Sequence, residues 1–258
     1  MTGKRLRLSG RLMAVAGFIE NGSDVADVGA DHGYLPVYLA QNGLARRIIA
    51  SDISPRSHKS AMNSAAIYSV SDRIKFIAAP GLAGIGESEV DTIVMAGMGG
   101  ETITGILADA PWTKNRGIKI IMQPQTKTDR LCSWLLDNGY ALRSAALVRD
   151  KGRIYVVIVA KAREFGIRNS EFGISGNKAG INEAAIAYLD GELSLLSLLA
   201  EKNDPLFCDY IGELISKARR AAEGMARSGA PGHADAIERL DMLVGIRDAK
   251  LEMLRSLG

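Results

Sequence analysis

The sequence is poor in the residues that build disulfide frameworks and metal sites. Its 258 residues include only two cysteines and three histidines. Cys132 and Cys208 each stand in an apolar helical context without metal-ligand spacing, so we expect two reduced core thiols and a cytoplasmic protein. The histidines are too scattered along the chain to form a ligand cluster, and we therefore expect no metal.

Long apolar runs are also missing, and none approaches the roughly 20 residues of a membrane span. The run Leu12–Ile19 follows several basic residues and superficially imitates a secretion signal, but it is short and Arg11 interrupts its approach. Its largest apolar side chains recur at helical spacing, which predicts an amphipathic core helix instead. We expect neither a membrane span nor a secretion leader.

A strong excess of one charge is lacking too. Lysine and arginine number 32 against 29 acidic residues, a formal net charge of +3. Such a balance permits nucleic-acid binding without indicating it. The hydrophobic content of 47% and the length predict one sizeable α/β domain and something smaller.

The most informative stretch is Asp27-Val-Gly-Ala-Asp-His-Gly-Tyr-Leu-Pro36. It predicts a buried strand that ends in a glycine turn and opens a helix, with Gly29 and Gly33 letting backbone approach a ligand closely. Asp52 follows at the tip of the next apolar run. A carboxylate at that place can accept hydrogen bonds from both hydroxyls of a ribose, so the pattern predicts a nucleoside-containing cofactor.

The charge of the turn indicates which cofactor to expect. A dinucleotide fingerprint has a glycine where this chain has Asp31, whose charge would repel a pyrophosphate. S-adenosylmethionine carries a ribose, no phosphate and two cationic groups, so a turn lined by Asp27 and Asp31 suits it. The alternative is that Asp31 only caps the following helix.

Strands and helices alternate along the first half of the chain. Strands are expected from about residue 24 and over 47–51, 74–78, 91–96 and 118–122, with helices between them. This order predicts a parallel sheet with right-handed crossovers and ligands at the carboxyl ends of its strands. The runs 140–148 and 154–160 are joined by five residues and must form a hairpin, so an antiparallel strand is expected to end the sheet. This is the α/β architecture of the Rossmann-like methyltransferases.

Beyond residue 161 the composition changes. Residues 166–180 look irregular, and the rest shows only helical periodicity. The three apolar stripes are Ile186, Leu189, Leu193, Leu196 and Leu199; Ile211, Ile215, Ala218, Ala222 and Met225; and Ile237, Leu240, Val244, Leu251 and Leu254. Their spacing predicts packed antiparallel helices of coiled-coil type. We therefore expect a cofactor-binding domain over residues 1–162 and an all-α, coiled-coil-like domain over residues 163–258.

Basic residues of this helical part are interleaved with acidic ones. They are Lys217, Arg219, Arg220, Arg227, Arg239, Arg247, Lys250 and Arg255. A solvated coiled-coil surface and a platform for an RNA backbone are both compatible with the pattern.

Four segments carry a family resemblance: Leu12–Ile19, residues 27–36, Ala96-Gly-Met-Gly-Gly100 and Gln123-Pro124. Together, over about residues 6–160, they resemble the bacterial tRNA (adenine-22-N1)-methyltransferase family. The resemblance implies S-adenosylmethionine as cofactor, tRNA as substrate and partner, and a Rossmann-like domain followed by a helical one. We expect a monomer or weak homodimer.

The chain departs from the family pattern at two places. Where the family usually has Gly-Asp-Gly-Leu, this chain has Ala79-Pro-Gly-Leu82, so the carboxylate expected to meet the adenine amino group of the cofactor is absent. Gln125 replaces the asparagine of the family's Gln-Pro-Asn. Two other functions remain. The first is a methyltransferase for small molecules or proteins whose helices serve dimerisation. The second is a nicotinamide-binding or sensor module, which Asp31 and the terminal hairpin disfavour.

Candidate site residues follow from the motifs and the resemblance together. The expected cofactor-binding residues are Asp27, Gly29, Asp31, His32, Gly33, Asp52, Ile53, Gly81, Leu82, Ala96, Gly97 and Met98. The expected substrate-positioning residues are Gly99, Gly100, Gln123 and Pro124. Adenine N1 is a neutral lone pair, so its methylation needs no general base, only alignment and a dry site. Gln123 is the candidate for the adenine edge. His32 and Tyr34 either line the substrate mouth or play structural roles.

Overall fold

The computed structural model describes residues 5–115, 117–163, 183–229 and 231–256, with the backbone alone over 183–190. Its strands are β1 (Ser23–Val28), β2 (Ala45–Ser51), β3 (Lys75–Ile77), β4 (Thr92–Ala96), β5 (Lys119–Gln123), β6 (Tyr140–Asp150) and β7 (Arg153–Ala162). Its α-helices are α1 (Gly10–Ala16), α2 (Tyr34–Asn42), α3 (Pro55–Ile67), α4 (Gly100–Ala108), α5 (Thr128–Asp137), α6 (Glu183–Glu201), α7 (Phe207–Ser228) and α8 (His233–Ser256). Short 3-10 helices span Ser71–Arg73, Glu87–Glu89 and Pro111–Lys114.

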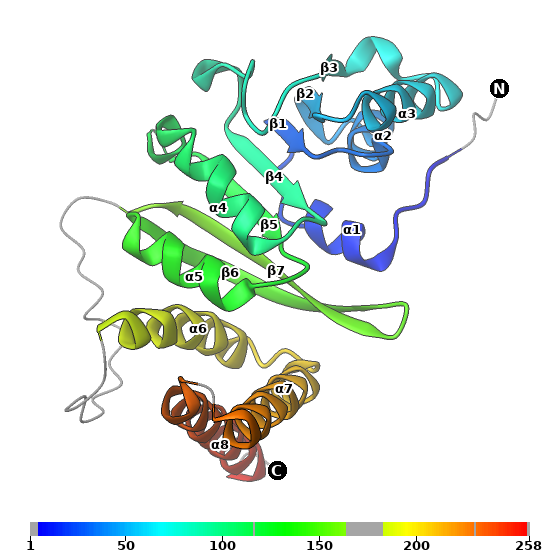
Figure 1. The fold of residues 1–258 in the computed structure, drawn as a ribbon. Coiled ribbons are helices and arrows are strands. Elements are labelled where there is room, and N and C mark those ends of the chain that lie inside the picture. Colours follow the sequence, from blue (N-terminus) through cyan, green and yellow to red (C-terminus); the bar gives the residue numbers. More distant parts are fainter. Residues whose placement is uncertain (1–4, 116, 164–182, 230, 257–258) are drawn as a thin grey trace.

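The strands form one sheet in the order β3-β2-β1-β4-β5-β7-β6 (Figure 1). The pairings among β1 to β5 are all parallel, whereas β7 is antiparallel to both β5 and β6. The expected hairpin therefore does end the sheet. Its antiparallel strand is not at the edge, however, because β7 is inserted between β5 and β6. A short connection dictates that two strands pair with each other, but not which of them meets the rest of the sheet.

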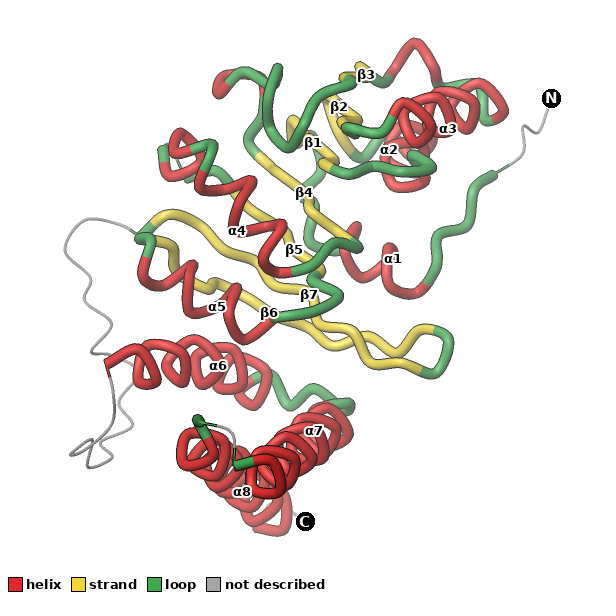
Figure 2. The backbone as a smooth tube through the Cα atoms, in the orientation of Figure 1, coloured by secondary structure: helices red, strands yellow, loops and turns green. Residues whose placement is uncertain are grey.

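Alternating side chains of the parallel strands divide the core into two layers, as the period of two requires. Ala26, Ile93 and Ile120 face a layer built with α4 and α5, whereas Val94 and Ile121 face a layer built with α1, α2 and α3. Helices thus cover both faces of the sheet, as the tube view also shows (Figure 2). The crossover pattern expected from the sequence is confirmed.

The first helix is shorter than expected. Ser9 caps it by accepting a hydrogen bond from the backbone N–H of Leu12, and Gly17 ends it, so the predicted last apolar position, Ile19, lies beyond the helix. Ile19 is nevertheless buried at 9% exposure. The helix is also held to the hairpin, because the backbone N–H of Arg11 donates to Asp150 across 3.3 Å.

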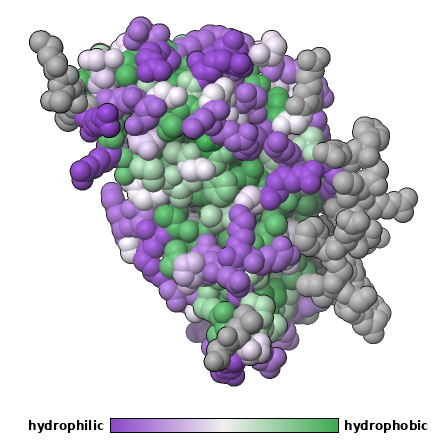
Figure 3. Space-filling view, turned by 180° about the vertical axis from the view of Figure 1, so that it is seen from behind, coloured by the Kyte–Doolittle hydropathy of each residue, from purple (hydrophilic) through white to green (hydrophobic). Residues whose placement is uncertain are grey.

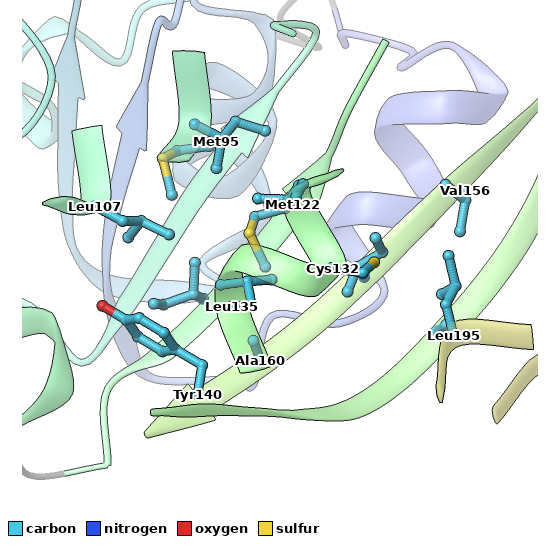
Figure 4. Packing of buried hydrophobic residues seen from close by; sticks show 14 of the residues in the cluster. Met95, Leu107, Met122, Cys132, Leu135, Tyr140, Val156, Ala160 and Leu195 are labelled. Carbon is cyan, nitrogen blue, oxygen red and sulfur yellow. The ribbon is translucent and has the colours of Figure 1, made fainter. Parts of the chain in front are cut away.

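The three C-terminal helices share the core of the sheet. Helix α6 packs against α5 and β6, and α7 pairs with α8. In Figure 4, Leu195 of α6 and Val156 of β7 point toward one another, and both belong to the large cluster that also contains buried residues of α7 and α8. The expected irregular segment 166–180 lies outside the described residues, as do the side chains of Ile186 and Leu189.

The predicted stripe of α8 is partly wrong. Ile237 and Leu254 are exposed at 38% and 44%, whereas Leu243, outside the stripe, is fully buried. Lys250 is 7% exposed, and its ammonium group donates to the backbone oxygen of Ala200 across 2.7 Å. The face of α8 that contacts the rest of the protein therefore contains charged residues, which a search for apolar periodicity does not detect. Lys250 cannot belong to a solvated basic surface.

The remaining surface is mixed in polarity. On the side opposite to that of Figure 1, hydrophobic residues gather in the middle of the face and hydrophilic ones above and below them (Figure 3). In the part of the chain that the structure describes, no helix is both long and apolar enough to span a membrane. Cys132, which is buried, and Cys208, which is half-buried, are free thiols as expected.

Candidate cofactor and substrate site

The candidate site lies at the carboxyl edge of the parallel strands. The register aligns Val28 with Ser51 and Ala96 with Gln123, so β1, β2, β4 and β5 end along one edge. The strand order reverses between β1 and β4. In open α/β sheets ligands bind at such a switch point, and the turns that flank it here contain most of the predicted site residues.

The turn after β1 is held by backbone hydrogen bonds. Gly29 has φ 73° and donates to the backbone oxygen of Ser51 across 2.8 Å. Gly33 has φ 67° and donates to the backbone oxygen of Ala30 across 2.7 Å. A Cβ atom at position 33 would lie 2.9 Å from the Cβ of Ala61, so this glycine is also required by the close approach of α3. Asp31 adopts φ 45°, a conformation that aspartate tolerates better than most residues.

Asp52 connects the second strand end to this turn. One oxygen of its half-buried carboxylate accepts a hydrogen bond from the backbone N–H of Asp31 across 3.0 Å, and the other accepts from that of Ser54 across 2.8 Å. Each carboxylate oxygen keeps a lone pair for a further donor. Ser54 itself caps α3, because its hydroxyl accepts a hydrogen bond from the backbone N–H of Ser57.

Asp27 is the buried acid of the site. Its side chain is 5% exposed, and burial, with a further contribution from the negative charge of Asp52, raises its pKa from 3.8 to about 7. The positive charge of Arg11 acts in the opposite direction. Asp27 and Asp52 are thus close enough to interact electrostatically. Such a pair is stabilised by a cation, since a positive charge favours the ionised form of both carboxyls.

The turn after β4 lies against the turn after β1. A Cβ atom at Gly29 would approach the Cε atom of Met98 to 2.8 Å, so the methionine packs directly over that glycine. Gly97 has φ 90° and donates to the backbone oxygen of Gln123 across 3.0 Å. At Gly100 a Cβ atom would lie 2.4 Å from the backbone oxygen of Lys127. These contacts bring the predicted cofactor turn and the predicted substrate turn together.

Gln123 is completely buried, and its amide is engaged on both sides. The oxygen accepts from Nη1 of Arg11 across 2.5 Å and from Nε2 of Gln125 across 3.2 Å, and the amide nitrogen donates to the backbone oxygen of Pro124 across 3.0 Å. Pro124 is buried as well. These hydrogen bonds hold Gln123 in a fixed position behind the turn Gly97–Gly100. Arg11 was not among the expected site residues. Its position directly before the apolar run Leu12–Ile19 was the feature of the sequence that could have indicated it.

The other predicted residues occupy different places around this centre. His32 stacks on Tyr34 with ring centroids 5.4 Å apart, and its Nδ1 lies 2.7 Å from the hydroxyl of Ser60. Tyr34 is 42% exposed and so is not a core aromatic, and Ile53 is 69% exposed. Both therefore have side chains accessible from solvent beside the acidic turn.

The segment after β3 is tied to β2. The Ser51 hydroxyl donates to the backbone oxygen of Gly81 across 3.3 Å, and Gly81 has φ 54°. The side chain of Leu82 is only 5% exposed and packs in the core. Ala96 is half-buried at the end of β4.

A doubly wound sheet with acidic turns at its switch point defines a nucleoside-binding protein of the Rossmann-like class. The family model described as "Methyltransferase domain" matches residues 8–158, and the chain belongs to that family.

Three relatives illustrate the similarity. The curated tRNA (adenine(22)-N(1))-methyltransferase of Bacillus subtilis is 35% identical over 157 residues, which is 61% of this chain and 66% of that protein, just under two thirds of its length. The solved B. subtilis m1A22 tRNA methyltransferase TrmK is 28% identical with a TM-score of 0.69, over 96% of this chain and 99% of that one. M. capricolum TrmK, solved with S-adenosyl-homocysteine, shares the fold at 23% identity and a TM-score of 0.68, over 94% and 97% of the two chains.

Proposed function

We propose that this protein transfers a methyl group from S-adenosylmethionine to N1 of an adenine in tRNA, at position 22. The observation that most supports this proposal is the acidic pair Asp27 and Asp52 at the switch point of a methyltransferase-family sheet. The choice of substrate rests on the similarity to the tRNA (adenine(22)-N(1))-methyltransferase of B. subtilis.

The residues present fit the methyl donor. Asp52 ends β2 with a half-buried carboxylate, where a ribose in the switch-point crevice would place its hydroxyls. Burial and the charge of Asp52 raise the pKa of Asp27. A cationic ligand beside Asp27 would favour its ionised form. Met98 packs over Gly29 and provides an apolar contact, and the guanidinium of Arg11 lies beside Gly97. When bound, S-adenosylmethionine supplies the electrophilic methyl group.

The work of the protein is alignment rather than proton transfer. Adenine N1 attacks with its own lone pair, so no side chain has to remove a proton from it. The turn Gly97–Gly100 forms the wall against which the base is held about 3 Å from the methyl carbon. The buried Gln123 supports this wall from behind, because its backbone oxygen accepts a hydrogen bond from the N–H of Gly97. An adenine within a folded RNA must be turned out of its stack to reach that wall.

The two parts of the chain take different roles in this proposal. Residues 1–162 hold the methyl donor and the reacting base, and residues 163–258 contribute contacts to the rest of the tRNA. Lys217, Arg219, Arg220 and Arg255 are exposed, whereas Arg239 is bound to Glu192 and Lys250 is buried. The free thiols of Cys132 and Cys208 fit a reducing compartment, the cytoplasm.

One experiment tests the proposal directly. The protein is incubated with S-adenosylmethionine labelled in its methyl group and with unmodified bacterial tRNA, and the methylated base is then mapped. We expect a single 1-methyladenosine at position 22. Label incorporated into a small molecule or a protein but not into tRNA would instead favour the second methyltransferase function, with the helices serving dimerisation. Absence of cofactor binding would exclude both.

A further inference from the structure

A cavity of about 540 Å³ lies between the segment Pro124–Asp129, the beginning of β7 and helices α6, α7 and α8. We call it the helix-side cavity. One wall of it is shared with the candidate methyl-transfer centre. The backbone N–H of Gly100 donates to the backbone oxygen of Thr126 across 2.8 Å, and that of Gln125 donates to the backbone oxygen of Met98 across 2.9 Å. A ligand bound against this wall of the cavity therefore lies close to the glycine turn.

Three exposed cations from three different elements line the helix-side cavity. They are Lys127 in the segment before α5, Arg153 at the start of β7 and Lys217 on α7. Among the residues that the structure describes, none of these three side chains has an ion-pair partner. Their convergence on one cavity concentrates positive charge at its rim.

Part of the acidic lining is neutralised by an arginine. Arg239 donates to both carboxylate oxygens of Glu192, each across 2.7 Å, and lies 3.5 Å from the carboxylate of Asp129. Glu213 on α7 is then the acidic lining residue outside this cluster. The cluster of Arg239 with two carboxylates keeps one negative charge, so the lining as a whole has four cations against three carboxylates. The net charge is +1, and the three cations that have no ion-pair partner among the described residues lie at the exposed rim, so an anion is favoured there.

The inner wall of the cavity is apolar. Ile154, Tyr155 and Leu214 are half-buried and line it together with the buried Leu195. A site for single-stranded nucleic acid combines these features, because the bases stack on apolar or aromatic groups while the phosphates meet cations.

We propose that the helix-side cavity binds the ribose-phosphate backbone of the RNA beside the nucleotide that is methylated, with Lys127, Arg153 and Lys217 contacting its phosphates. The proposal rests on the proposed function and specifies how the tRNA is held. An adenine placed against Gly97–Gly100 leaves its flanking nucleotides at the shared wall, which also lines the cavity. Phosphate contacts of this kind position the substrate without reading its sequence.

The test replaces the three cations together, as Lys127→Gln, Arg153→Gln and Lys217→Gln. All three are exposed, so the variant is expected to fold. The matched control, Arg7→Gln with Lys114→Gln and Arg143→Gln, removes the same charge from exposed positions that neither line the cavity nor belong to the helices proposed to contact the tRNA. Binding of an unmodified tRNA transcript is measured by fluorescence anisotropy over a range of salt concentrations, and S-adenosylmethionine binding is measured by calorimetry.

We expect the cavity variant to bind the transcript at least tenfold more weakly near physiological salt and to reduce the slope of log K against log salt by about 2 to 3. Cofactor affinity should be unchanged, and the control variant should lose much less RNA affinity. Wild-type affinity and slope in the folded cavity variant would overturn the cavity proposal, as would an equal loss in the control. If the wild type binds the transcript tightly through the cavity but does not methylate it, the cavity proposal is supported and the proposed function is refuted. If the wild type binds no transcript, both are refuted.

Discussion

The guanidinium of Arg11 donates to the amide oxygen of Gln123 across 2.5 Å, linking α1 to the carboxyl end of β5. The same group lies 5.9 Å from the ring centroid of Tyr155. Its positive charge partly offsets the rise in the pKa of Asp27. One side chain therefore touches the proposed substrate wall and also influences the proposed cofactor turn.

Replacing Arg11 should separate these two effects. Arg11→Ala releases the oxygen of Gln123, so the wall loses its fixed orientation, and the rate at saturating substrates should fall about 10- to 100-fold. It should also raise the pKa of Asp27 further. Arg11→Lys keeps the charge but not the planar fork, so it should lower the rate while leaving the pH profile nearly unchanged. Single-turnover methylation rates measured across pH check this, and a wild-type rate in Arg11→Ala would contradict the role.

The raised pKa of Asp27 predicts a definite dependence of stability on pH. In the unfolded chain the pKa is about 3.9, whereas in the folded protein it is about 7. Between these values the folded state keeps a proton that the unfolded state has lost. The contribution of Asp27 to stability therefore falls as pH rises through this window and levels off above it.

Asp27→Asn removes this titration. Below about pH 4 the difference in unfolding free energy between the variant and the wild type should be constant. Between pH 4 and 7 only the wild type loses this contribution, so the difference should shift toward a more stable variant by roughly 4 kcal/mol at most. Denaturant unfolding at pH 4, 5.5, 7 and 8 measures the difference. A difference that does not change with pH would show that Asp27 titrates normally.

Asp52 should be decisive for binding of the methyl donor. Asp52→Ala should weaken S-adenosylmethionine binding by an order of magnitude or more, because two acceptors for the ribose are lost. The carboxylate also holds the backbone N–H groups of Asp31 and Ser54, so Asp52→Asn, which keeps one acceptor oxygen, should lose less affinity. Calorimetric titration measures both, with the exposed Asp72→Ala as a control of equal charge change. Unchanged affinity in Asp52→Ala would refute the ribose role.

The sequence predicts the backbone geometry of the turn after β1 well because its determinants are local. Gly29 and Gly33 occupy positions with positive φ that the strand-turn-helix pattern requires, and both were identified. The proximity of Asp27 and Asp52 also follows from the sequence, because neighbouring parallel strands end at the same edge of a sheet.

The unpredicted features depend on contacts between distant segments. Arg11 and Gln123 are 112 residues apart, and no local pattern relates them. The buried face of α8 includes Arg239 and Lys250, whose partners lie on α6 and just after it. Apolar periodicity therefore indicates that α8 is a helix but misplaces the side that faces the protein.

The two glycines of α4 should respond oppositely to a methyl group. Gly100→Ala brings a Cβ atom within 2.4 Å of the backbone oxygen of Lys127, so the loop must move, which should cost about 1–3 kcal/mol and slow methylation. Gly105→Ala meets nothing within 4 Å in the same helix and should stabilise it by about 0.5–1 kcal/mol. Thermal unfolding and initial rates of both variants check this. Equal behaviour of the two would show that the loop after β5 yields easily.

Arg239 should be the residue that fastens α8 to the rest of the protein. Its two bonds reach Glu192, which is 4% exposed, so Arg239→Ala leaves a buried carboxylate without its cation and should destabilise the fold by about 3–5 kcal/mol. Arg227→Ala on α7 is the control, because its contact with Glu223 is a 3.8 Å surface pair and should contribute little. Denaturant unfolding distinguishes the two. If Arg239→Ala were no less stable than Arg227→Ala, the packing of α8 would depend on its apolar contacts around Leu243 and not on this ion pair.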